Sequence, residues 1–349
     1  MFVETQHAAS LLFYPVLTNI RYNTSTLNQA IALNPDHPKV HLASGYYQSM
    51  CLNDFNSALR EFETAYQGEP NNGDIANSIG VTHWKLGNWK QAEKNLLKAV
   101  ELDPLNFLVF EPLGLFYKQQ RQFQKADYYF NLMIKLDPEQ AYSYIFRAYN
   151  YLHGYGDIKK ARSLLKEAVV NAKDPQEIFY AQYFTELYAR DFPKALSYAI
   201  SDKELYFGSL FVGRTYYYSG QEEQAQAEFE SMRIYLEEKA QEEPASAGYH
   251  SKLGQVYAHL GLKEKAIAEG QKAVELQPVN NNHVDGPIFV QRLAEVYILT
   301  GEHELAINNI EYLLSIPSEL TIWQLRLDPI YDPLRDNPLF QKLVDSVST

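Results

Sequence analysis

Small residues and prolines recur along this chain about every 34 residues, and this period restricts the possible folds more than any other feature. Prolines stand at positions 35, 70, 104 and 138, at intervals of 35, 34 and 34 residues. Alanines recur in step with them at positions 58, 92, 126 and 161, and again at 225, 266 and 306. A unit of this length cannot bury its apolar face alone, so the period predicts an array of stacked units.

The unit that begins at Gly80 reads as two short helices joined by a tight turn. Gly80 lets the first helix approach the second closely, and Gly87 suits a turn that needs positive φ. Pro104 ends the second helix, because proline disfavours a helical conformation in the residue before it. A tyrosine three positions after the small residue, such as Tyr117 after Gly114, is expected to fill the wedge between neighbouring hairpins. Glycines suited to the same turn recur at Gly156, Gly220, Gly261 and Gly301.

This pattern resembles the tetratricopeptide repeat, a helix–turn–helix unit of about 34 residues. The resemblance covers nearly the whole chain and is strongest over residues 38–173 and 206–314. It implies an all-α fold, a right-handed superhelical solenoid of helical hairpins. Because many independent positions match, the fold prediction is specific.

The repeat pattern divides the chain into three parts. We expect residues 1–37 to form a degenerate N-terminal repeat, and residues 38–315 to form about eight hairpins with an irregular stretch at 176–205. Residues 316–349 are rich in proline and leave the pattern. They are expected to form a helical cap over the apolar face of the last hairpin, because solenoids need capped ends.

Two features of the C-terminal part carry further expectations. Asp332 and Asn337 each precede a proline, so each can cap a short helix that begins with that proline.

Residues 263–344 also resemble the end of a bacterial group of tetratricopeptide proteins. In that group the array often follows a kinase, nucleotide cyclase or winged-helix domain, commonly with a membrane span and a TolB-like segment between. Since the sequence holds no motif of those domains, we expect a detached part of such a receptor or a stand-alone relative.

Charge and composition exclude several classes of partner. The chain has 43 acidic and 31 basic residues, a net charge of -12, which argues against nucleic acid as a partner. No apolar run reaches the roughly 18–20 residues of a membrane helix, so direct membrane insertion is not expected. Cys51 is the only cysteine, which excludes an internal disulfide. We expect a cytoplasmic protein, or an extracytoplasmic one if it belongs to a membrane-tethered receptor.

The sequence contains no motif for catalysis or for binding a cofactor. His37 and His41 flank Pro38 at a helix start, and no metal-ligand spacing accompanies them. Acidic pairs such as Glu222-Glu223 lie on polar helix faces and indicate solvated surface. We therefore expect no enzyme activity, no cofactor and no metal. The alternative is a hydrolase with clustered carboxylates, and a strongly raised carboxylate pKa in a closed pocket would be evidence for it.

The first helix of each hairpin carries the candidate binding residues, because the resemblance implies that this helix lines the concave face. Its centre is rich in tyrosine, and aromatic side chains dominate binding interfaces. The candidate groove residues are Tyr46, Trp84, Tyr142, Tyr149, Tyr180, Phe184, Tyr188, Phe207, Arg214, Tyr217 and Tyr218. Other residues at the same helix positions are Asn77, Lys85, Glu111, Lys118, His153, Lys252, Gln255, Gln291 and Glu295. For any single tyrosine, packing between hairpins is the alternative role.

The sequence therefore predicts a non-catalytic scaffold that binds a peptide or another partner segment in an aromatic groove. One alternative is a sensor or oligomerisation module of a signalling receptor, and assembly into a homo-oligomer stays open. Another alternative is an array that binds a small molecule. The carboxylate clamp known in the family is not matched, because Asn77 and Lys85 are followed in the next unit by Glu111 and Leu115.

Overall fold

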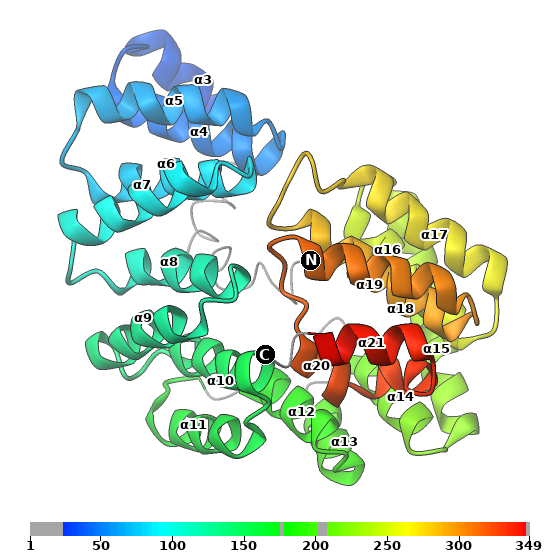
Figure 1. The fold of residues 1–349 in the computed structure, drawn as a ribbon. Coiled ribbons are helices and arrows are strands. Elements are labelled where there is room, and N and C mark those ends of the chain that lie inside the picture. Colours follow the sequence, from blue (N-terminus) through cyan, green and yellow to red (C-terminus); the bar gives the residue numbers. More distant parts are fainter. Residues whose placement is uncertain (1–23, 175–177, 202–207, 347–349) are drawn as a thin grey trace. The chain divides into compact units, whose positions relative to one another are not determined.

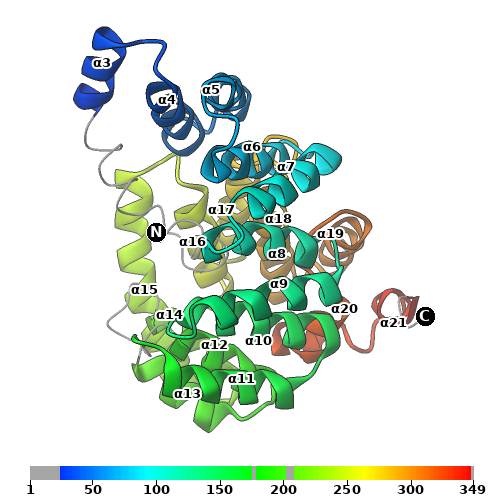
Figure 2. The same ribbon diagram turned by 90° about the vertical axis from the view of Figure 1, so that its left-hand side faces the viewer.

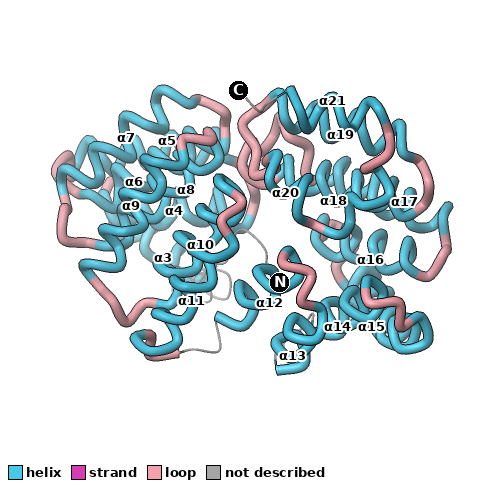
Figure 3. Tube along the Cα trace, turned by 60° about the horizontal axis from the view of Figure 1, so that its bottom comes forward, coloured by secondary structure: helices cyan, strands magenta, loops and turns pink. Residues whose placement is uncertain are grey.

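The fold, taken from a computed structural model, is described for residues 24–174, 178–201 and 208–346. Within these residues every regular element is a helix, and loops join the helices (Figure 3). The predicted all-α class is therefore confirmed. Phe207 and residues 1–23 of the predicted N-terminal repeat lie outside the described residues.

The described helices form consecutive hairpins, in which each first helix packs on the second (Figure 1). Helix α3 (Thr24–Leu33) precedes them, and α20 (Ile322–Leu327), the 3-10 helix η2 (Pro329–Leu334) and α21 (Pro338–Ser346) follow. The pairs are α4 (Pro38–Cys51) with α5 (Phe55–Gly68), α6 (Gly73–Lys85) with α7 (Trp89–Leu102), α8 (Phe107–Gln119) with α9 (Phe123–Leu136), α10 (Ala141–Tyr155) with α11 (Ile158–Asn171), α12 (Phe179–Tyr188) with α13 (Phe192–Ser201), α14 (Gly208–Tyr218) with α15 (Glu222–Glu242), α16 (Ala247–His259) with α17 (Lys263–Leu276), and α18 (Gly286–Leu299) with α19 (His303–Ser315).

The chain divides into two compact units, and each has its own hairpins. Unit 1 contains residues 24–117, Gln124–Asp137 and Asn280–Asp285, the last of which form most of the loop between α17 and α18. Unit 2 contains the remaining described residues, which are Lys118–Phe123, Pro138–Val279 without its undescribed positions, and 286–346. The hairpins from α10 to α13 and the C-terminal helices therefore belong to the same unit.

The turns inside the hairpins have the backbone conformation that the glycines predict. Gly87, Gly156, Gly220, Gly261 and Gly301 all adopt positive φ, between 65° and 80°. This part of the prediction is confirmed. Three hairpins place a non-glycine residue at the equivalent turn position, Asn53, Arg121 and Arg190, with φ of 53°, 56° and 60°. A left-handed arginine is uncommon, because its Cβ crowds the backbone there.

Close approach of the paired helices depends on the small residues, as the sequence predicts. A Cβ on Gly114 of α8 would lie 2.5 Å from Cε1 of Phe130 on α9, a distance that real Cβ atoms do not reach. At Gly80 of α6, the same atom would lie 2.8 Å from Cγ of Leu96 on α7. The matching alanines of the second helices are all buried, at Ala58, Ala92, Ala126, Ala161, Ala225, Ala266 and Ala306.

The tyrosines after the small residues connect successive hairpins. The Tyr117 hydroxyl on α8 donates a hydrogen bond to Glu93 Oε1 on α7 over 2.8 Å. The Tyr257 hydroxyl on α16 likewise donates to Glu237 Oε1 on α15 over 2.7 Å. Each tyrosine thus reaches the second helix of the preceding hairpin, which confirms the predicted position in the wedge.

The C-terminal helices extend the apolar core of unit 2 beyond the last hairpin. Buried side chains of α18 and α19 form one cluster with those of the C-terminal helices. Figure 1 shows α20 and α21 close to α18 and α19. The C-terminal members of this cluster are Leu320, Ile322, Leu325, Ile330, Tyr331, Leu334 and Phe340. The apolar edge of the last hairpin is therefore covered by these residues.

The two predicted helix caps at the C-terminus have different outcomes. Asn337 caps α21, because its Oδ1 accepts the backbone N–H of Leu339 over 2.9 Å. The expectation for Asp332 was wrong, since Asp328 caps η2 and Asp332 lies inside that helix. The reason is that η2 begins at Pro329, one X-Pro pair earlier than expected, which leaves the Asp332 carboxylate free for ion pairing.

We predict that Gly114→Ala lowers the midpoint of thermal unfolding, because the new methyl group overlaps Phe130. Overpacking of this kind costs about 1–3 kcal/mol. Gly248→Ala is the control, since a Cβ there meets only Ser246 Oγ, at 3.8 Å. This control should be stabilising by about 0.5–1 kcal/mol, as expected for alanine over glycine in a helix. Circular dichroism melts of both variants measure the difference, and equal midpoints would contradict the close-packing argument.

We also predict that Leu325→Ala destabilises unit 2, because Leu325 is fully buried in the cluster that joins α20 to the last hairpin. Removal of a buried leucine costs about 2–5 kcal/mol. Leu339 is the matched control, because its side chain is 58% exposed. Leu339→Ala should change stability by less than about 0.5 kcal/mol. Denaturant titrations compare the two, and a neutral Leu325→Ala would show that the C-terminal helices contribute little to the core.

Candidate functional site

The candidate groove residues lie on the first helices of five hairpins, which belong to two units. Tyr46 on α4 and Trp84 on α6 belong to unit 1, and Phe207 lies outside the described residues. The remaining candidates lie on α10, α12 and α14 of unit 2: Tyr142, Tyr149, Tyr180, Phe184, Tyr188, Arg214, Tyr217 and Tyr218. The arrangement within unit 2 is therefore the candidate site.

The two candidates in unit 1 pack between successive hairpins. The Tyr46 ring meets Phe62 edge-on at 5.3 Å, and its hydroxyl lies 2.9 Å from Ser78 Oγ on α6. Burial raises the pKa of Tyr46 to about 12, which the hydrogen bond with Ser78 partly opposes. The Trp84 ring meets Phe116 of α8 edge-on at 5.8 Å. Both side chains hold neighbouring hairpins together.

In unit 2 an unbroken series of aromatic contacts runs from α10 to α12. The Tyr149 ring stacks on His153 with centroids 5.2 Å apart, and His153 contacts Tyr188 at 6.0 Å. Phe184 contacts Tyr188 at 6.2 Å and Tyr180 at 5.0 Å. Four of the candidate aromatic residues are therefore brought together on α10 and α12.

Tyr142 and Tyr217 lie at the edges of this arrangement. Tyr142 stacks on Phe146 of its own helix, with ring centroids 6.3 Å apart. Tyr217 contacts the neighbouring Tyr218 ring at 5.4 Å and the His259 ring of α16 at 4.9 Å. Tyr217 is 43% exposed, so it offers aromatic surface to a partner.

A buried arginine lies beside buried carboxyl groups in the same unit. Burial alone lowers the pKa of Arg214, but Tyr218, Tyr183, Glu295 and Asp328 raise it well above its usual value, so the guanidinium stays charged. Burial raises the pKa of both carboxyls, and Arg214 opposes that rise. Gln255 on α16 also donates to Glu295 Oε2 over 2.6 Å.

The chain's own C-terminal segment lies on this part of unit 2. We use this name for residues 316–334, which include α20 and η2. At its start, the Arg121 guanidinium donates to the carbonyl oxygens of Ile316 and Leu320, over 3.1 and 3.2 Å, and to Ser318 Oγ over 3.2 Å. Lys118 pairs with Glu319 over 2.8 Å. The loop that leaves the last hairpin is thus held by residues at the end of α8 and in the turn after it.

The segment then crosses the ends of α10 and α12. The Thr321 hydroxyl donates to the carbonyl oxygen of His153 over 2.6 Å, and α20 lies beside α10 (Figure 2). Further along, the Arg190 guanidinium holds both carboxylate oxygens of Asp332, over 2.5 and 2.7 Å. Tyr188 also forms a hydrogen bond with the buried Asp328 carboxyl. These contacts join the segment to two first helices that carry candidate residues.

Arg121 and Arg190 occupy the strained turn positions noted above, and both bind the C-terminal segment. The hairpin turn that lies between these two along the chain, at Gly156, packs against the Trp323 ring of α20. A strained backbone persists where surrounding contacts determine it, and such positions cluster at functional sites. The sequence did not single out these arginines. The available signal was an arginine at two turns where other repeats carry glycine.

The described residues show no arrangement for metal chemistry. No group of three or more histidine, cysteine, aspartate or glutamate side chains could hold an ion within this part of the chain. His37 instead caps α4, and His41 Nδ1 lies 2.7 Å from Glu61 Oε2. In the helices that the structure describes, none has the length and apolar character needed to span a membrane.

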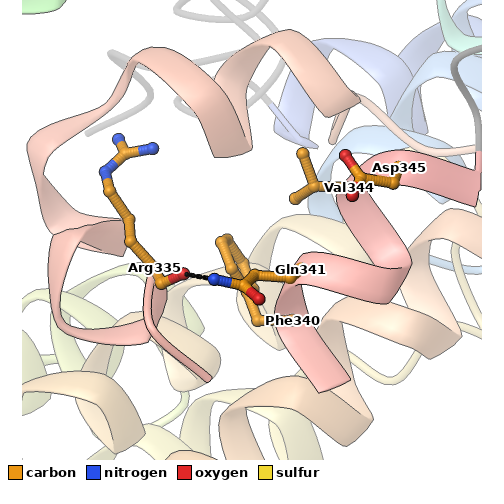
Figure 4. Close-up of a pocket in the computed structure, with 5 residues that line it drawn as sticks. All are labelled: Arg335, Phe340, Gln341, Val344 and Asp345. Atoms are coloured by element: carbon orange, nitrogen blue, oxygen red, sulfur yellow. Dashed lines mark hydrogen bonds between the residues drawn. The ribbon is translucent and has the colours of Figure 1, made fainter. Parts of the chain in front are cut away.

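A pocket at the C-terminus has the carboxyl group of Asp345 as the one carboxyl group among its lining residues. It is lined by Arg335, Phe340, Gln341, Val344 and Asp345, and Gln341 Nε2 donates to the Arg335 carbonyl over 2.8 Å (Figure 4). The raised carboxyl pKa values of Asp328 and Glu295 therefore occur away from this pocket.

Glu111 in unit 1 is a further buried carboxyl group with a raised pKa. Burial raises the pKa of Glu111 to about 8, and its Oε1 has no hydrogen-bond partner. Acid–base catalysis by a carboxyl group needs a second reacting group within hydrogen-bond reach. The raised pKa is explained by burial alone.

Comparisons with known proteins identify the repeats. The tetratricopeptide repeat family model matches residues 52–107 and 213–281. Tetratricopeptide repeat protein 6 of Homo sapiens is 31% identical over 127 residues, a stretch that covers 34% of this chain and 23% of that protein. The chain thus spans about a quarter of the length of this relative. It contains tetratricopeptide repeats, as the sequence pattern predicts.

Solved structures support the same fold. A tetratricopeptide repeat protein from Parabacteroides merdae superposes with a TM-score of 0.51 at 17% identity, covering 76% of this chain and 98% of that one. Human IFIT1, in a structure with m7Gppp-AAAA, superposes with a TM-score of 0.50 at 16% identity, covering 82% of this chain and 69% of that one. At this level of identity the likeness shows the fold, an all-α solenoid of stacked hairpins.

We predict that stability falls with rising pH because of Glu111. Its pKa is 4.5 when unperturbed and about 8 in the fold, so folding favours the protonated acid. This contribution is fully present below pH 4.5 and is lost as the pH rises through 8. Over that window the loss is up to about 1.4 kcal/mol per pH unit.

Glu111→Gln is uncharged at every pH, so it should unfold at a higher temperature than the unsubstituted protein at pH 9 and at a similar temperature near pH 5. The exposed Glu304, changed to Gln, is the matched control and should leave the pH dependence intact. Melts recorded across this pH range test the assignment. An unchanged pH profile in Glu111→Gln would contradict it.

Proposed function

We propose that the chain is a non-catalytic scaffold whose unit 2 binds a segment of a partner protein on the aromatic face of α10, α12 and α14. Tetratricopeptide repeat proteins typically mediate protein–protein interactions. The observation that carries the proposal is the C-terminal segment of the chain itself. It lies at the ends of α10 and α12 through hydrogen bonds and an ion pair, as a bound peptide would.

The chemistry of this face suits an extended, acidic partner segment. Its aromatic side chains supply large contact area at a low cost in conformational entropy. Arg190 supplies positive charge and already holds Asp332 of the C-terminal segment. Arg214 adds a buried positive charge in the same unit. Tyr217 is exposed and therefore adds aromatic surface that a partner can contact.

A small-molecule site is a second candidate, because several buried polar atoms of unit 2 lack partners. Tyr149 Oη, His153 Nδ1 and His259 Nδ1 are buried without a hydrogen bond. Buried polar groups are normally satisfied, so a polar ligand could supply the missing bonds. Native mass spectrometry of the purified protein distinguishes a small-molecule site from a peptide scaffold. A bound small molecule would add its mass to that of the protein, whereas a peptide scaffold needs no such ligand.

A sensor or oligomerisation role in a bacterial signalling receptor rests on the sequence resemblance alone. Sedimentation analysis separates it from the scaffold proposal. A stable complex between copies of the chain would favour oligomerisation, and a monomer that captures a different protein would favour the scaffold.

We predict that Tyr217→Ala lowers recovery of the partner at least about tenfold in a pull-down from the native source, as expected for a tyrosine hot spot. Helicity should be retained, because Tyr217 is 43% exposed. Tyr312→Ala is the matched control, since Tyr312 on α19 is 42% exposed. If the two variants recover the partner equally well, Tyr217 is not part of the binding surface.

A further inference from the structure

We infer that Asp332 of the C-terminal segment is a built-in competitor for Arg190 on the proposed binding face of unit 2. The partner that displaces it is an acidic peptide in which an aspartate precedes a proline, as Asp332 precedes Pro333. This inference rests on the proposed function and adds the partner's chemistry and the means of its regulation.

The first step of the argument is that the segment has two different sides. Its apolar side chains, including Leu325, Ile330 and Leu334, belong to the core built on α18 and α19. Its polar groups face the other way, toward α10, α12 and the turns that follow them. The apolar side can keep the segment on the last hairpin while the polar side is released.

The second step is that the outer polar contact is accessible to water. Arg190 and Asp332 are 37% and 43% exposed, although both oxygens of the carboxylate are held. Exposed ion pairs contribute little, because water and salt compete for both charges. A partner carboxylate can therefore take the place of Asp332 on Arg190.

The third step is that the inner part of the segment stays in place. Asp328 is buried, and its carboxyl accepts the backbone N–H of Ile330 over 3.0 Å. Ile330 and Tyr331 belong to the apolar cluster built on α18 and α19. Exchange with a partner is therefore confined to the exposed Asp332 end of the segment, where the Arg190 guanidinium holds a carboxylate.

The fourth step concerns the prolines. Pro329 opens η2, and Pro333 follows Asp332 directly. Proline fixes φ and reduces the number of conformations that the free peptide must lose on binding. A partner with the same Asp-Pro spacing would be preorganised in the same way.

The turn at Arg190 supports this assignment independently. Its backbone has a φ of 60°, which glycine would adopt without strain. The guanidinium provides what glycine cannot, a two-pronged contact to a carboxylate. The position thus combines an unfavourable backbone with a side chain suited to an acidic ligand.

The test uses a fluorescent peptide of residues 327–336 and the full-length protein. Asp332→Asn in the protein weakens the internal competitor and leaves every residue of the binding face unchanged. Fluorescence anisotropy should show that this variant binds the peptide at least about fivefold more tightly than the unsubstituted protein. Asp336→Asn is the matched control, because it removes the same charge from an exposed position four residues on. It should bind the peptide as the unsubstituted protein does.

Two further arms locate the site. Adding Arg190→Ala to Asp332→Asn should abolish the gain in affinity, and a peptide of the same composition in scrambled order should not bind. Hydrogen exchange on the Asp332→Asn protein should show that the intact peptide changes protection in α10 and α12. Saturable binding that is equal in the unsubstituted protein, the Asp332→Asn variant and the double variant, or no binding to any of them, would overturn the inference.

Failure of this inference is distinguishable from failure of the proposed function. A partner whose capture depends on Tyr217, together with no peptide binding, would retain the scaffold and remove the competitor. If Asp332→Asn binds the peptide most tightly but partner capture does not depend on Tyr217, the competitor is retained and the partner binds to another surface.

Discussion

The close contact between a glycine of the first helix and a large side chain of the second is the constraint on which four of the described hairpins depend. Gly45, Gly114 and Gly213 make the same contact with a phenylalanine, where an added Cβ would lie 2.5, 2.5 and 2.9 Å away from the ring. With the two helices so close, the first helix can use its remaining faces to contact the next hairpin and, in unit 2, to present aromatic residues. The proposed binding face is thus a consequence of how the hairpins of unit 2 are packed.

Most of the local structure could be predicted from the sequence, because it depends on contacts within one repeat. The turn glycines, the buried alanines and the bridging tyrosines recur with the period, so each copy supports the interpretation of the others. Arg121 and Arg190 could not be interpreted in this way. Their side chains contact residues about 195 and 142 positions away, and a periodic signal carries no information about such distances. The misplaced cap at Asp332 has another origin, because the 3-10 helix begins at the earlier of two neighbouring Asp-Pro pairs, at Pro329.

The candidate site was predictable only in part. Reading the first helices placed eight candidates on three neighbouring helices of unit 2, and the aromatic contacts between α10 and α12 join four of them. Which of them are exposed was not predictable, since exposure depends on where the C-terminal segment lies. That segment was expected to cover the last hairpin, and its polar contacts with α10 and α12 leave no pattern in the sequence.

The C-terminal segment combines two kinds of contact that respond differently to a partner. Its apolar contacts with α18 and α19 are numerous and need no particular geometry, so they are lost only when the core itself opens. Its polar contacts with Arg121, His153 and Arg190 are few and directional. The contact with Arg190 is the exposed one of these three, so a carboxylate of another ligand can replace Asp332 there. Under the proposed function, the segment gives up Arg190 to a partner without unfolding, because the apolar contacts that stabilise the fold and the ion pair that occupies Arg190 lie on opposite sides of the same short stretch of chain.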